Sequence, residues 1–181
     1  MIDWIRKRGC RFRMRKMLQA ESRNVEAINI KKAKQLGVLF NAEKKEQLKQ
    51  AKHLLQDLNK QFPELEVHFL GWYKKEKPEG SEGLKNFHFF NKNDYGFFYE
   101  PKANVPAVGV FMERKYDIVM DLSMDFIYPI KRLLLNMDCS LRVGIFSQNN
   151  EPFFDLFINT RKDVSEFSKH AIHYLSILND N

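Results

Sequence analysis

The sequence predicts an α/β protein: a three-layer, Rossmann-like sandwich with a mostly parallel sheet, preceded by a basic N-terminal helical extension. Three observations support this fold class. Short apolar runs alternate with stretches of helical periodicity, as in parallel strands joined by crossover helices. The length of 181 residues suits one domain, which we place at 35–181. The positive charge precedes the first apolar run and defines an extension over 1–34.

The first strand–helix–strand unit follows that extension. The apolar run 35–40 predicts a buried strand, and Asn41 can cap the helix after it. Pro63 ends this helix, and residues 66–71 form the next apolar run. The helix carries apolar side chains at steps of three and four residues: Leu48, Ala51, Leu55, Leu58 and Phe62. Two parallel strands joined by a right-handed crossover are therefore expected.

An irregular, aromatic-rich insertion is expected at about 74–107. Its first part is a charged loop rich in proline and glycine. Residues 87–90 form a short strand candidate, and seven aromatic side chains lie between Phe87 and Tyr99. Exposed aromatic rings could stack on RNA bases, but phenylalanine at this density more often builds a core or an interface.

Regular structure returns after the insertion. Residues 116–123 form the most strand-like segment of the chain, and a helix is expected over 126–137. Two more strands are expected at 141–146 and 153–158. The last helix begins at Asp163, where Glu166 completes a pattern that resembles a capping box.

The charge distribution is the clearest functional signal. Residues 1–34 hold 11 Lys and Arg against 3 Asp and Glu, a net charge of +8, whereas the other 147 residues hold 19 against 20, a net charge of −1. A concentrated basic segment attracts RNA, DNA or an anionic membrane. The predicted polyanion-binding residues are Arg6, Lys7, Arg8, Arg11, Arg13, Arg15 and Lys16.

Nucleic acid is favoured over a membrane as the partner of this segment. A helix that lies on a membrane needs an apolar face opposite a basic one. At 100° per residue, Ile5 and Phe12 cluster, but Met14, Met17 and Leu18 point elsewhere and the basic residues surround the helix. A segment that is merely solvated, or that folds onto its own domain, stays open as an alternative.

No catalytic residue, cofactor or metal site is predicted. Neither G-x-G-x-x-G nor G-x-x-x-x-G-K-[ST] occurs, which argues against the usual NAD and NTP sites. His170 and His173 could share one side of a helix, but they lack a third metal ligand. Cys10 and Cys139 are interpreted as free thiols, and with no signal peptide this favours a cytoplasmic protein.

One polar cluster could hold a ligand. Asp121, Ser123 and Asp125 would lie at the carboxyl end of a strand, where wound sheets bind their ligands. They could contact a metal ion, a sugar or a hydroxyl group. The competing interpretation, that they cap the next helix, is favoured.

The order of the segments resembles an uncharacterised family of Bacteroidota proteins, a domain of unknown function. This resemblance implies a fold over most of the chain after about residue 30 and supplies no activity. It is carried by the segments 36–40, 116–123, 141–144, 155–158 and 174–178.

A second resemblance is to the N-terminal half of heptosyltransferase-like GT-B glycosyltransferases. It is carried by Tyr-Asp-Ile-Val-x-Asp-Leu at 116–122, a helix, and Arg-Val-Gly at 142–144. Those enzymes hold the donor nucleotide in a second Rossmann-like domain that this sequence does not contain. The resemblance therefore implies no transfer by this chain alone, and it assigns no catalytic residue.

These patterns favour a non-enzymatic binding protein whose basic segment contacts RNA, with ribosomal RNA as one candidate, or another polyanion. The alternatives are a ligand-binding or catalytic remnant of a GT-B N-terminal domain and attachment to an anionic membrane. The sequence leaves the small-molecule ligand and the oligomeric state open.

Overall fold

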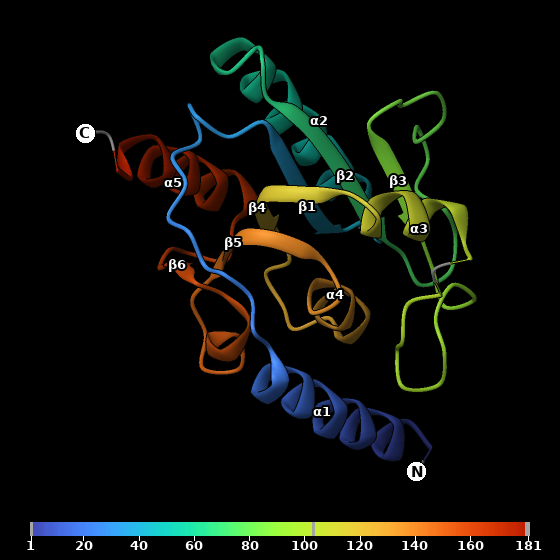
Figure 1. Ribbon diagram of the computed structural model, residues 1–181. Helices are drawn as coiled ribbons and strands as arrows, with labels where there is room; N and C mark the ends of the chain where they lie inside the picture. Colours follow the sequence, from blue (N-terminus) through green and yellow to red (C-terminus); the bar gives the residue numbers. More distant parts are fainter. Residues whose placement is uncertain (1, 103, 180–181) are drawn as a thin grey trace.

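A computed structural model describes residues 2–102 and 104–179. Its centre is a sheet of six parallel strands in the order β3-β2-β1-β4-β5-β6 (Figure 1). The predicted Rossmann-like α/β fold is confirmed. The strands are β1 (Gln35–Asn41), β2 (Glu66–Trp72), β3 (Phe87–Phe90), β4 (Lys115–Asp121), β5 (Asp138–Ile145) and β6 (Leu156–Ile158).

Helices cover both faces of the sheet (Figure 1). They are α1 (Ile2–Ala20), α2 (Lys45–Gln61), α3 (Pro106–Met112), α4 (Tyr128–Leu134) and α5 (Val164–Ile177). Buried side chains of α2 and α5 belong to the core on one face. Those of α3 and α4 belong to the core on the other face, where α1 packs against α4 as an additional outer layer.

The core under α2 and α5 follows from the sequence periodicity. Leu48, Ala51 and Leu58 of α2 are buried as predicted, and Leu54 is buried beside them. Asp163 begins α5 by accepting the backbone N–H of Glu166 at 2.8 Å. Apolar side chains at steps of three and four residues therefore place both helices flat on the sheet.

Three elements differ from the prediction. The fourth helix is shorter than 126–137, because Ile127, the residue before Tyr128, is extended and Pro129 lies in the first turn. The last strand is shorter than 153–158, because a 3-10 turn (Glu151–Phe153) precedes it. The helix α3 was not predicted, since seven residues are too few to show a helical period.

The segment between α1 and β1 is fixed to the domain. Arg23 donates two hydrogen bonds to the carboxylate of Asp155, at 2.7 and 2.8 Å. The buried Arg142 of β5 binds Glu21 at 2.7 Å. Asp117 of β4 accepts the backbone N–H groups of Lys34 and Gln35 and so positions the start of β1.

Within residues 2–102 and 104–179, no helix has both the length and the apolar character needed to cross a bilayer.

Candidate functional site

The carboxyl ends of the strands border a crevice of about 510 Å3. Asn41 is the last residue of β1 and Trp72 is the last residue of β2. Lys92 lies in the turn after β3, and Phe126 belongs to the connection from β4 to α4. From β1 the sheet grows in one direction through β2 to β3, and from β4 it grows in the other direction through β5 to β6. The strand order therefore reverses between the neighbouring strands β1 and β4. The crevice therefore lies at the switch point where open α/β sheets bind their ligands.

The first turns of α1 form one wall of this crevice. Asp3, Arg6 and Lys7 line it, and Lys7 binds Asp3 at 2.7 Å. The guanidinium carbon of Arg6 lies 4.0 Å from the ring centre of Tyr99 and 5.4 Å from that of Tyr95. The basic N-terminal segment is thus part of the molecular body at the edge where a ligand would enter.

Aromatic residues of the insertion contact two arginines of α1, Arg6 and Arg13. Arg6 Nε also donates to the carbonyl oxygen of Phe97 at 2.6 Å. Arg13 lies 4.3 Å from the ring centre of Phe98 and binds the carboxylate of Glu100 at 2.6 Å. Cation–π contacts between segments almost ninety residues apart therefore hold α1 on the insertion.

The buried side of α1 is narrow. Cys10 and Met14 are buried against α4, and burial raises the pKa of the Cys10 thiol to about 11. This thiol therefore stays protonated at neutral pH, which makes it a packing group and not a nucleophile. Gly9 faces the ring of Phe98 so closely that a Cβ atom would overlap it. Glycine in the middle of this helix is explained by that approach.

One flank of α1, next to its buried side, is exposed and basic. Trp4, Arg8, Arg11 and Arg15 follow one another at steps of four, three and four residues, so they form one stripe, here called the arginine stripe. Among the described residues, no carboxylate lies within ion-pair distance of these three arginines. The neighbouring stripe holds the exposed residues Ile5, Phe12 and Lys16.

The seven predicted polyanion-binding residues thus divide into two groups. Lys7 and Arg13 bind carboxylates, and Arg6 donates a hydrogen bond to the carbonyl oxygen of Phe97. The side chains that face outward without an acidic partner are Arg8, Arg11, Arg15 and Lys16; Arg8 lies over Trp4, Arg11 over Tyr128 and Lys16 over Phe12.

The predicted cluster after β4 is divided between the interior and the surface. Asp121 is buried and binds the buried ammonium group of Lys131 at 2.6 Å, and it also accepts the backbone N–H of Ser123. Asp125 is exposed, lines the crevice and binds Lys162 at 2.9 Å. Only Asp125 of these three is therefore open to a ligand in the crevice.

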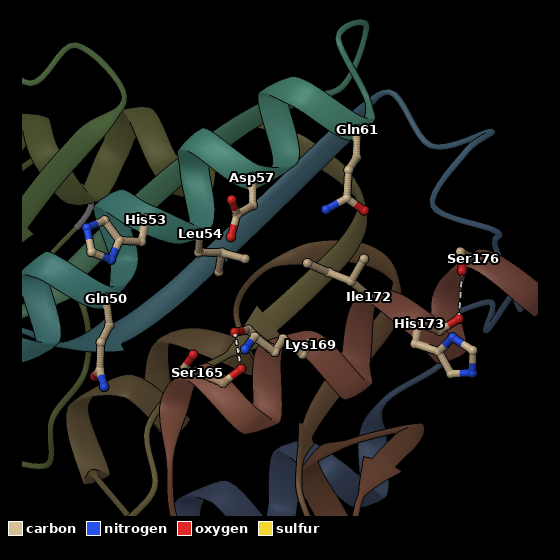
Figure 2. A pocket seen from close by; sticks show the side chains of 11 residues that line it. Gln50, His53, Leu54, Asp57, Gln61, Ser165, Lys169, Ile172, His173 and Ser176 are labelled. Carbon is tan, nitrogen blue, oxygen red and sulfur yellow. Dashed lines mark hydrogen bonds between the residues drawn. The ribbon is translucent and has the colours of Figure 1, made fainter.

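A polar groove of about 290 Å3 separates α2 from α5 on the far face of the sheet. Figure 2 shows His53 of α2 and His173 of α5 at opposite ends of it. His170 lies 4.0 Å from Glu166, its neighbour on the same helix. No group of three histidine, cysteine or acidic side chains in the described part of the chain could hold a metal ion.

Sequence reasoning missed most of the crevice. Trp72 and Lys74 lie at and after the end of β2, Lys92 follows β3, and Tyr95 and Tyr99 belong to the insertion. Burial raises the pKa of both tyrosines, which keeps their hydroxyl groups protonated. The available signal was positional: polar and aromatic residues just after several parallel strands meet at one edge.

Comparison with known proteins agrees with this architecture. Residues 6–178 match a family of unknown function (DUF6913). No curated protein matches the chain. Among solved structures, the E. coli heptosyltransferase WaaC with ADP is similar, with a TM-score of 0.50 and 8% sequence identity over 81% of this chain and 48% of the enzyme. The chain spans about half the length of that enzyme, and the likeness shows a shared fold.

Proposed function

The chain belongs to this family of unknown function (DUF6913), and we propose that it is a binding protein that holds single-stranded RNA on the outer face of α1. The observation that carries the proposal is the arginine stripe, whose guanidinium groups have no acidic partner among the described residues. Uncompensated arginines on a rigid helix are suited to phosphate groups, which they bind with two parallel hydrogen bonds.

The aromatic side chains on the same face favour an unpaired strand over a duplex. Trp4 is 61% exposed and Phe12 is 59% exposed, so both rings offer a surface on which a base can stack. Arg11 and Arg15 also line a hollow of about 410 Å3 together with Phe126 and Phe153. Flat apolar surfaces beside cations match the alternation of base and phosphate along a single strand.

The arrangement is less suited to a membrane. A helix that lies in a bilayer surface keeps its cations at the borders of an apolar face. Viewed down the axis of α1, the directions of Arg8 and Arg15 lie between those of Trp4 and Phe12. Insertion of the two rings would therefore bury the guanidinium groups in the lipid. That burial opposes insertion, whereas the same spacing places cations next to stacked bases.

The test is fluorescence anisotropy with an unstructured RNA of about 20 nucleotides in salt from about 50 to 200 mM. Four cations can contact phosphates: Arg8, Arg11, Arg15 and Lys16. If all four do, a plot of the logarithm of affinity against the logarithm of salt concentration should have a slope of about −3. The double variant Arg8→Glu/Arg15→Glu should lose at least about tenfold in affinity, because both sites change from attraction to repulsion.

The matched control is Lys49→Glu/Lys60→Glu, which makes the same change of net charge on the exposed surface of α2. It should alter the affinity less than about threefold, since a screened distant charge acts only weakly. Equal losses in the two double variants would reject the site. Binding to phosphatidylserine vesicles with no binding to RNA would reject the proposal in favour of a membrane.

A further inference from the structure

The crevice at the carboxyl edge contains charged groups that the described chain leaves unneutralised. Lys74 and Lys92 line it, and no carboxylate among the described residues lies within ion-pair distance of either. Glu43 lines the same crevice, and none of the basic side chains in residues 2–102 and 104–179 lies within ion-pair distance of it. Side chains of both signs therefore remain available for a ligand that carries an anionic group and hydrogen-bond donors.

Aromatic rings line the crevice together with these charged groups. Tyr99 and Tyr128 are stacked with their ring centres 5.5 Å apart, and Phe126 meets Tyr128 edge-on at 5.1 Å. Trp72 also lines the crevice. Aromatic surfaces beside carboxylate and amide groups are suited to a sugar ring, whose C–H face is apolar and whose edge carries hydroxyl groups.

The backbone at Tyr99 supports the same location. Its φ angle is +63°, in the left-handed region that residues other than glycine, asparagine and aspartate rarely adopt. This conformation costs about 1 kcal/mol or more and persists only where surrounding contacts hold it. Here the ring of Tyr99 contacts both Arg6 and Tyr128, and all three residues line the crevice.

We propose that this crevice is a binding site for a phosphorylated sugar. Lys74 and Lys92 would contact the phosphate, Glu43 and Asn41 would accept and donate hydrogen bonds to hydroxyl groups, and the aromatic wall would pack on the ring. The volume of about 510 Å3 lies within the range of small-molecule sites. This site is separate from the arginine stripe and does not depend on RNA binding.

The loops of this edge also restrict the ligand. The loop after β1 contains no glycine, so backbone N–H groups cannot form the phosphate cradle that dinucleotide and nucleotide sites use. We therefore assign the phosphate to the side-chain cations that line the crevice. A terminal phosphate on a small polyol meets that requirement better than a pyrophosphate buried against a helix.

The experiment follows the two tryptophan indole N–H resonances in nitrogen-15 NMR spectra of the full chain. Trp72 lines the crevice, whereas Trp4 lies on the outer face of α1, so the second indole serves as an internal control. Glucose 6-phosphate, added up to about 10 mM, should shift the Trp72 resonance in a saturable manner and leave Trp4 unchanged. Glucose and inorganic phosphate are titrated separately, and each alone should bind at least about tenfold more weakly.

Two double variants locate the phosphate. Lys74→Gln/Lys92→Gln should weaken the binding of glucose 6-phosphate at least about tenfold, because two charge-assisted hydrogen bonds are lost. Lys49→Gln/Lys60→Gln removes the same charge from α2 and should leave the affinity unchanged within about twofold.

Three results would overturn the proposal: no shift of the Trp72 resonance with the sugar phosphate, equal binding of inorganic phosphate alone, or equal affinity in the two double variants. Binding of RNA to the arginine stripe is measured independently on the same proteins. Lys74→Gln/Lys92→Gln should retain RNA binding, so failure of one proposal is distinguishable from failure of the other.

Discussion

The two faces of the sheet are built by different chemistry. Under α2 and α5 the packing is apolar, with aliphatic side chains of both helices against Phe40 and Phe69. Under α1 and α4 the interior includes the buried ion pair of Asp121 and Lys131. Desolvation of two charges offsets much of their attraction, so such a pair adds little net stability although losing one partner is costly. Both faces bury a large apolar cluster, and the difference indicates that the second face also accommodates a charged pair at the carboxyl end of β4.

Removal of one partner of the buried ion pair on the second face should change the stability of the protein most. Lys131→Met leaves the buried carboxylate of Asp121 without its cation and should lower the free energy of unfolding by about 3–5 kcal/mol. Leu58→Met introduces the same residue into the apolar face and should cost less than about 1.5 kcal/mol, because the volume is conserved. Urea denaturation followed by circular dichroism measures both values.

The double variant Asp121→Asn/Lys131→Met separates the lost charge from a lost shape. The amide oxygen can still accept the backbone N–H of Ser123, and no uncompensated charge remains. It should recover at least about half of the loss, since a neutral pair avoids the desolvation of a lone carboxylate. Equal instability of the single and double variants would show that packing, and not charge, sets the cost.

The arginines of α1 offer a second comparison, between a docked and an exposed side chain of the same helix. Arg6 contacts Tyr99 and donates to the Phe97 carbonyl, whereas Arg8 lies over the exposed Trp4. Arg6→Ala should lower the free energy of unfolding by about 1–2 kcal/mol, the range of a partly buried cation–π contact with a hydrogen bond. Arg8→Ala should cost less than about 0.5 kcal/mol, as is usual for the surface. Equal values would mean that the aromatic insertion does not anchor α1.

A contrast between local repeats and long-range contacts explains which features the sequence could predict. Apolar runs and helical periods identified β1, β4 and α5, because burial against one sheet face imposes a local repeat. The contact of Arg6 with Tyr99 joins segments about ninety residues apart and leaves no local pattern. The crevice was missed for a related reason: Lys74 and Lys92 meet only after parallel strands align their carboxyl ends. Composition placed the charge correctly in the N-terminal segment, but it could not tell which arginines face outward.

Gly9 gives the finest comparison, because helix propensity and tertiary packing predict opposite signs there. In a helix that projects freely, Gly9→Ala would gain about 1 kcal/mol of helix stability. In the docked helix the added methyl group overlaps the ring of Phe98, and such overpacking costs about 1–3 kcal/mol. The variant should therefore be destabilised by about 1 kcal/mol in urea denaturation. Gly9→Ala/Phe98→Ala makes room for the methyl group and should recover the propensity gain relative to Phe98→Ala alone. A stabilised single variant would contradict the close approach of α1 to the insertion, because only a helix released from Phe98 can benefit from alanine at this position.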